Sequence, residues 1–69
     1  MEMEITVNGE KRVGLTSPLT VSELLEQLEI NPKSIIVERN FEIVAKNKVN
    51  ETTVQDGDTI EIIRLVGGG

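Results

Sequence analysis

The sequence contains no cysteine and no histidine, and Phe41 is its only aromatic residue. Without cysteine the chain cannot form a disulfide or a thiolate metal site, and a Cys/His or Ser/His nucleophile system is impossible. Histidine is also the usual general base near neutral pH and the commonest metal ligand. These absences argue against catalytic side chains of its own. We expect a protein that is not an enzyme and that binds no metal or cofactor.

Positive charge is also scarce, since 7 Lys and Arg residues stand against 12 Asp and Glu residues, giving a net charge of −5. Such a surface repels phosphates, which argues against nucleic acid and favours basic protein partners. No apolar run is long enough for a membrane span, and the acidic start at residues 1–4 is unlike a signal peptide. We expect a cytoplasmic protein that contacts no membrane.

The first half of the 69 residues predicts a hairpin followed by a helix. Apolar alternation over residues 3–7 is typical of a half-buried strand, and Asn8-Gly9 suits a type I′ turn. The second arm is expected to place Val13 and Leu15 on one face. Residues 20–23 have capping-box spacing, and an apolar stripe over 21–28 predicts a helix with one buried face. Asn31-Pro32 is expected to end that helix.

The second half predicts three further strands. Short β-branched runs at residues 34–37 and 43–44 surround a turn that contains Phe41, which we expect to fill the core rather than to form an exposed contact. A tight turn over residues 55–58 precedes the strongest strand pattern, residues 59–66. This order favours an α+β domain, with a mixed β-sheet of four to five strands and one helix packed across one face.

The last strand carries apolar residues where polar ones are expected. Ile62 has core-facing parity and Glu61 outward parity, yet Ile63 and Leu65 fall on the side of Glu61. Outward apolar residues indicate a docking surface, although a bulge or a covering segment is an alternative. We therefore predict that Ile63, Leu65 and Val66 are partner-binding residues.

Three glycines, Gly67, Gly68 and Gly69, end the sequence directly after this strand. A glycine run adds nothing to a core, but it makes a thin segment that can bring an α-carboxylate into a narrow active site. A frayed tail or an added linker is the alternative interpretation. We predict a domain of residues 1–66 and a flexible tail of residues 67–69.

Three motifs stand out in the sequence: Val-Glu-Arg-Asn at residues 37–40, Asp-Gly-Asp-Thr-Ile-Glu-Ile at 56–62, and Val-Gly-Gly-Gly at 66–69. Together with the element order, they resemble the ThiS and MoaD family of ubiquitin-like sulfur carriers, and in particular its thiamine-biosynthesis branch. The resemblance covers essentially the whole chain. It implies a β-grasp fold in which the last strand lies beside the first.

The same resemblance implies a reaction at the carboxylate of Gly69, with Gly67 and Gly68 giving access. A partner enzyme adenylates this carboxylate with ATP and magnesium, and sulfur then replaces AMP to leave a thiocarboxylate. The implied partners are an E1-like adenylyltransferase of the ThiF type, a sulfur donor such as a cysteine desulfurase, and a thiazole synthase of the ThiG type. ATP and magnesium belong to the partner, so the carrier itself binds neither.

Three alternatives share much of this pattern. A related carrier for molybdopterin or cysteine synthesis differs only in the receiving enzyme. A ubiquitin-like modifier uses the same adenylated glycine to form an isopeptide bond with lysine. A non-covalent β-grasp interaction module makes no use of the glycines, so deletion of Gly68 and Gly69 leaves its partner binding intact.

Overall fold

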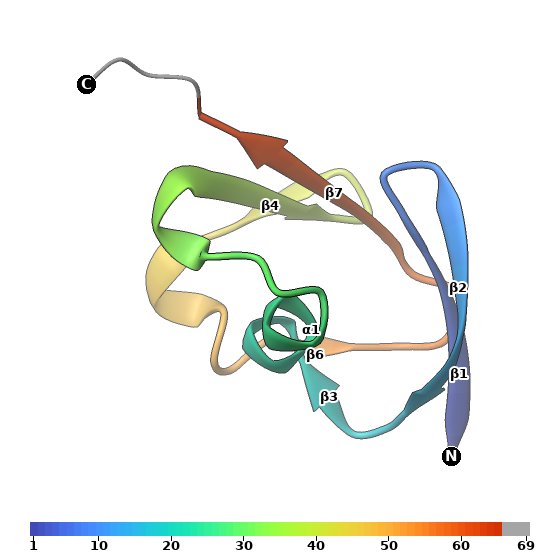
Figure 1. The fold of residues 1–69 in the computed structure, drawn as a ribbon. Helices are drawn as coiled ribbons and strands as arrows, with labels where there is room; N and C mark the ends of the chain where they lie inside the picture. Colours follow the sequence, from blue (N-terminus) through green and yellow to red (C-terminus); the bar gives the residue numbers. More distant parts are fainter. Residues whose placement is uncertain (66–69) are drawn as a thin grey trace.

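The computed structural model describes residues 1–65, which form a five-stranded mixed sheet, a two-stranded sheet and a helix (Figure 1). The strands are β1 (Glu2–Val7), β2 (Glu10–Thr16), β3 (Leu19–Thr20), β4 (Ile35–Arg39), β5 (Glu42–Val44), β6 (Thr53–Val54) and β7 (Thr59–Arg64). The helix is α1 (Val21–Gln27), and two 3-10 turns are η1 (Pro32–Ser34) and η2 (Lys46–Lys48). The large sheet has the order β2-β1-β7-β4-β5, and β3 pairs with β6. The predicted α+β class and mixed sheet are confirmed.

The opening hairpin forms as predicted, but its second strand is irregular. Asn8 and Gly9 both have positive φ, as a type I′ turn requires. Between the pairs Met3↔Leu15 and Ile5↔Arg12, β2 contains one more residue than β1. This bulge includes Gly14, whose φ is +79°, and it leaves Val13 exposed. The expectation that Val13 and Leu15 share a regular face is therefore wrong.

Helix α1 begins at the predicted capping box. The Thr20 hydroxyl accepts a hydrogen bond from the Glu23 amide at 3.1 Å, and the Glu23 carboxylate accepts one from the Thr20 amide at 2.8 Å. The helix ends earlier than Asn31-Pro32, because Glu29 adopts a φ of +58°. The amides of Glu29 and Ile30 donate to the carbonyls of Glu26 and Leu25, which is a Schellman ending.

The core lies between α1 and the inner face of the large sheet. Its buried apolar members are Met3, Ile5, Val7, Leu19, Val21, Leu24, Leu25, Ile35, Val37, Val54, Ile60 and Ile62. The short pair β3-β6, which the sequence pattern did not predict, flanks the start of α1 (Figure 1). Strand β7 is central: it runs parallel to β1 and antiparallel to β4.

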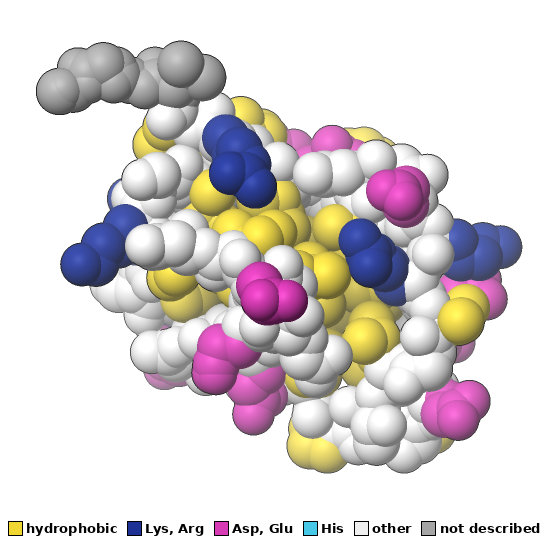
Figure 2. All heavy atoms as spheres, in the orientation of Figure 1, with side chains coloured by type: hydrophobic (Ala, Val, Ile, Leu, Met, Phe, Trp, Pro, Cys, Tyr) yellow, Lys and Arg dark blue, Asp and Glu magenta, His cyan; other side chains and the backbone are white. Residues whose placement is uncertain are grey.

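The surface mixes apolar and charged side chains. In Figure 2, hydrophobic side chains reach the surface in the middle of the face drawn, and Lys, Arg, Asp and Glu side chains surround them. Partly buried residues that pack against the core include Leu15, Leu28 and Ile30. Within residues 1–65 no helix has the length and apolar character needed to span a membrane.

The turn between β4 and β5 corrects one expectation. Asn40 and Phe41 occupy its two central positions, both with positive φ, and Arg39 pairs with Glu42 across it. This places the Phe41 ring at the surface, where the residue is 81% exposed. The prediction that Phe41 fills the core is wrong, because a two-residue turn projects its side chains away from the sheet.

Candidate functional site

Strand β7 leads directly to the predicted reactive tail. Leu65 directly follows β7, and its amide donates a hydrogen bond to the Ser34 carbonyl at 2.9 Å. This bond holds the end of the strand in place. Val66, Gly67, Gly68 and Gly69 lie outside the described residues. Their roles, and the division of the chain at residue 66, therefore remain predictions.

The outward parity predicted for the end of β7 is confirmed. Ile60 and Ile62 are buried, whereas Ile63 is 43% exposed and Leu65 is 48% exposed. Neither a bulge in β7 nor another described segment buries these two side chains. Apolar surface is thus available next to the tail, and its use by a partner remains a prediction.

The beginning of β7 is fixed by a buried carboxylate. Asp58 is 6% exposed, and its side chain accepts hydrogen bonds from Arg39 Nε at 2.7 Å and Asn40 Nδ2 at 3.0 Å. The Gln55 amide donates to the same carboxylate at 2.7 Å. Asn40 Oδ1 in turn accepts from the Thr59 amide at 2.9 Å. Arg39 and Asn40 therefore shape the turn and connect it to β7.

This network also lowers the pKa of Asp58. Burial by itself raises the pKa of this carboxyl group. The hydrogen bonds from Arg39, the Gln55 amide and Asn40, together with the charge of Arg39, outweigh burial and bring the pKa below its ordinary value. Asp58 is consequently charged at neutral pH, so its carboxylate accepts all of these hydrogen bonds at that pH.

A second side chain holds the middle of β7. Asn8 Oδ1 accepts a hydrogen bond from the Ile62 amide at 2.7 Å, and Asn8 Nδ2 donates to the Ile62 carbonyl at 3.3 Å. The Asn8 amide also donates to the Ile60 carbonyl. The side chain thus continues the β1–β7 ladder beyond the end of β1. Sequence reasoning assigned Asn8 only to the hairpin turn, because nothing local indicates a contact 54 residues away.

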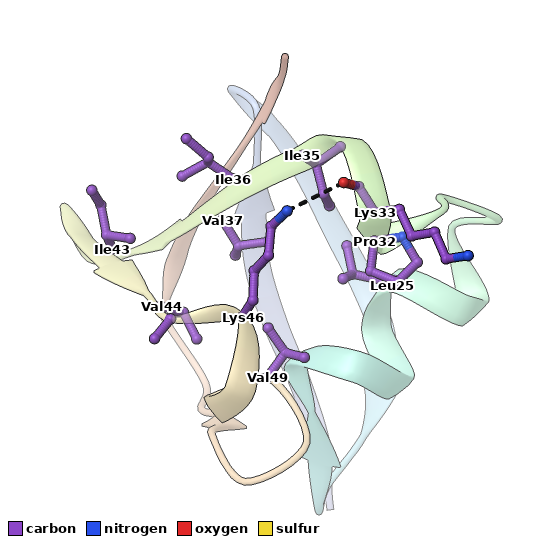
Figure 3. A pocket seen from close by; sticks show the side chains of 11 residues that line it. Leu25, Pro32, Lys33, Ile35, Ile36, Val37, Ile43, Val44, Lys46 and Val49 are labelled. Carbon is purple, nitrogen blue, oxygen red and sulfur yellow. Dashed lines mark hydrogen bonds between the residues drawn. The ribbon is translucent and has the colours of Figure 1, made fainter. Parts of the chain in front are cut away.

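An apolar groove of about 320 Å³ opens beside β4, a feature that the sequence did not predict. It lies between β4, β5, α1 and the two 3-10 turns, and Figure 3 shows side chains from each of these elements around it. Lys46 Nζ donates a hydrogen bond to the Lys33 carbonyl at 3.2 Å across this region (Figure 3). Two of the lining residues, Ile36 and Ile43, also belong to the outer side of the sheet.

The acidic side chains of residues 1–65 include no group of three or more that is arranged to hold a metal ion. Asp56, which together with Asp58 flanks Gly57, has a structural contact instead. Its Oδ1 accepts a hydrogen bond from the Glu4 amide at 2.7 Å, and the Gly57 amide donates to the Glu4 carbonyl. The turn before β7 is therefore tied to β1.

Known proteins resemble this chain over nearly its whole length. The model of the ThiS family matches residues 2–69. A crystal structure of thiamine biosynthesis protein ThiS from Geobacter metallireducens superposes with a TM-score of 0.83 at 38% identity, covering 97% of this chain and 100% of that one. This similarity confirms the β-grasp fold expected from the motifs.

Two curated relatives add detail. The sulfur carrier protein ThiS of Bacillus subtilis is 44% identical over 50 residues, which cover 72% of this chain and 76% of the relative. A thiazole synthase of Paramagnetospirillum magneticum is 40% identical over 67 residues, or 97% of this chain. The chain spans only 20% of the length of that synthase. Among the alternatives weighed from the sequence, these matches favour the thiamine branch, and the chain belongs to the ThiS family of sulfur carriers in thiamine biosynthesis.

Proposed function

We propose that this chain carries sulfur as a thiocarboxylate formed on the carboxyl group of Gly69. The observation that carries the proposal is the match of the ThiS family to residues 2–69, which includes all three glycines. Gly67 and Gly68 provide a segment without side chains that enters the active site of a partner. The protein acts as a substrate and donor rather than as an enzyme, and it works in the cytoplasm.

The reaction needs activation because a carboxylate is a poor electrophile. Under this proposal an E1-like adenylyltransferase of the ThiF type transfers AMP from ATP to the Gly69 carboxylate and releases pyrophosphate. A sulfur nucleophile then attacks the acyl carbon and AMP leaves, so that one carboxyl oxygen is replaced by sulfur. ATP and magnesium are held by the adenylyltransferase. When a donor such as a cysteine desulfurase supplies the sulfur as a persulfide, its attack gives an acyl disulfide, and a thiol reductant then cleaves the disulfide bond to leave the thiocarboxylate.

A thiazole synthase of the ThiG type is the proposed receiver. A segment similar to almost all of this chain occurs within the longer thiazole synthase of Paramagnetospirillum magneticum, which supports this partner. The exposed side chains of Ile63 and Leu65, followed by Val66, are the proposed contacts that position the tail in each partner. Fixing β7 through Asp58 and Asn8 keeps these contacts in a defined place.

Intact-protein mass spectrometry tests this function. The chain is incubated with an E1-like adenylyltransferase, ATP, magnesium and sulfide, beside a variant that lacks Gly68 and Gly69. We expect replacement of one oxygen by sulfur in the full chain and none in the variant. Oxidation of Met1 or Met3 changes the mass by nearly the same amount, so the change must be located in the C-terminal peptide.

The same experiment distinguishes the proposed function from its alternatives. An isopeptide bond to a lysine of another protein, in place of sulfur incorporation, indicates a modifier. An unchanged mass, when the same enzyme loads another ThiS protein in parallel, contradicts the proposed function.

A further inference from the structure

The turn between β1 and β2 consists of Asn8 and Gly9, which both have positive φ, at +50° and +82°. Asparagine followed by glycine is the pair that such a turn favours. The same pair is the one at which asparagine deamidates most readily, because glycine has no side chain to hinder attack by its backbone nitrogen. Both residues are exposed, and no atom beyond the adjoining residues lies within 4 Å of where a Gly9 Cβ would stand. Water and base therefore reach the reacting atoms.

Deamidation needs only water and the groups of these two residues. The Gly9 backbone nitrogen loses its proton and attacks Asn8 Cγ, ammonia leaves, and a succinimide ring forms. Water then opens the ring at either carbonyl. Opening at the side-chain carbonyl gives aspartate, whereas opening at the main-chain carbonyl gives isoaspartate, in which the backbone runs through Cβ and Cγ. Isoaspartate is usually the larger product, because the main-chain carbonyl lies next to the electron-withdrawing nitrogen on Cα and is the more electrophilic.

In the folded chain the Asn8 side chain is bound to β7 rather than turned toward its own backbone. Its Oδ1 accepts a hydrogen bond from the Ile62 amide at 2.7 Å, and its Nδ2 donates to the Ile62 carbonyl at 3.3 Å. The Asn8 amide donates to the Ile60 carbonyl at 2.9 Å, which fixes the backbone of the turn as well. Attack requires Asn8 Cγ to rotate toward the Gly9 nitrogen, so both side-chain hydrogen bonds must break first. The fold therefore slows the reaction by the free energy of this local opening.

We propose that Asn8 is a deamidation site whose reaction is restrained by the hydrogen bonds to Ile62, and that the isoaspartate product releases the middle of β7. In isoaspartate the free carboxylate is attached directly to Cα, so it is shorter by a methylene group and does not reach Ile62 as the Asn8 side chain does. The Nδ2 donor is also replaced by an oxygen, which the Ile62 carbonyl repels. The added backbone carbon lengthens the turn and disturbs the pairing of Val7 with Glu10.

The change affects the strand that leads to the C-terminal glycines. Asn8 holds the middle of β7, and after its conversion the Asp58 network still holds the beginning of the strand. Because hydrolysis does not restore the asparagine, the altered form accumulates with the age of the chain. The reaction needs no partner enzyme, so the inference is independent of the proposed function.

The test follows the mass of the peptide that contains Asn8, in the folded chain and in the chain unfolded in guanidinium chloride, at the same mildly alkaline pH and ionic strength. We expect this peptide to gain the mass that replaces NH2 by OH, at least about tenfold more slowly in the folded chain. Asn47 and Asn50 are internal controls, since both are exposed but precede Lys48 and Glu51, whose side chains hinder attack. In the unfolded chain their peptides should react more slowly than that of Asn8.

A second measurement tests the effect on β7. Anion exchange separates the deamidated chain, which carries an additional negative charge, and methylation by an isoaspartyl methyltransferase identifies the isoaspartate form. We expect this form to unfold at a lower urea concentration than the intact chain. Asn8→Asp is the matched control: it keeps the backbone length and an acceptor for the Ile62 amide, so its midpoint should lie between the two.

Three results would overturn the inference. An Asn8 peptide that keeps its mass in the unfolded chain shows that the site does not react. Equal rates in the folded and unfolded chain show that the hydrogen bonds to Ile62 do not restrain it. An isoaspartate form as stable as the intact chain shows that β7 is not released.

Discussion

Asp58 stabilises the fold by an amount that decreases in acid, because the residues around it lower its pKa. Its pKa in the folded protein is lowered by Arg39, the Gln55 amide and Asn40, despite burial. The unfolded chain therefore takes up this proton at a higher pH than the folded chain does. The stabilisation is fully present above the ordinary Asp value of about 3.9, and it is lost as pH falls below that value toward the folded pKa.

We predict that Asp58→Asn destabilises the domain by about 2–3 kcal/mol at pH 7, because the hydrogen bonds to a charged acceptor are lost. The free energy of unfolding of the variant should also fall less steeply than that of the wild type as the pH decreases below the ordinary Asp value of about 3.9. Urea titrations across this range measure both effects. Asp56→Asn is the matched control, and parallel pH profiles for the wild type and Asp58→Asn would contradict the assignment.

Among the elements, those specified by short-range signals were predicted from the sequence. The Asn8-Gly9 hairpin and the capping box at Thr20 each depend on residues no more than three positions apart. The early end of α1 was missed because Glu29 takes the left-handed conformation where glycine is the usual signal.

Contacts between distant segments could not be predicted from the sequence, for a different reason. Asn8 meets Ile62 across 54 positions, and Asp58 meets Arg39 across 19. Neither contact produces a periodic pattern in the sequence, because each involves isolated polar side chains rather than a repeated set. Outward parity of Ile63, in contrast, could be read from alternation along a single strand.

The turn between β4 and β5 offers a test at the level of the element. Phe41 holds a φ of +71° although it is 81% exposed, so its side chain contributes strain and little packing. We predict that Phe41→Gly raises the free energy of unfolding by up to about 1 kcal/mol, because relief of 1–2 kcal/mol of left-handed strain exceeds the entropy cost of glycine. The urea midpoint measures the change.

Phe41→Ala separates strain from loss of the ring. It removes the aromatic group but keeps a Cβ at positive φ, so it should give no such gain. If Phe41→Gly instead lowers the midpoint, the ring stabilises the turn through contacts that its exposure does not reveal.

For the whole molecule, the net charge of −5 affects folding and partner binding in opposite directions. Self-repulsion destabilises the compact state, and salt screens it. Attraction to a basic partner is screened as well. Raising NaCl from about 0.01 M to about 0.3 M should therefore raise the midpoint of thermal unfolding and lower kcat/KM for adenylation.

The variant Glu10→Gln/Glu26→Gln tests whether net charge is the cause. It removes two of the twelve acidic residues and changes the net charge from −5 to −3. Both salt effects should become smaller in this variant, since repulsion and steering each scale with charge. Thermal unfolding and the kinetics of ATP–pyrophosphate exchange, recorded at each NaCl concentration on the same samples, measure the two salt effects. If salt lowers the unfolding midpoint instead, attractive ion pairs such as Arg39–Asp58 outweigh self-repulsion in this fold, and stability and recognition then weaken together.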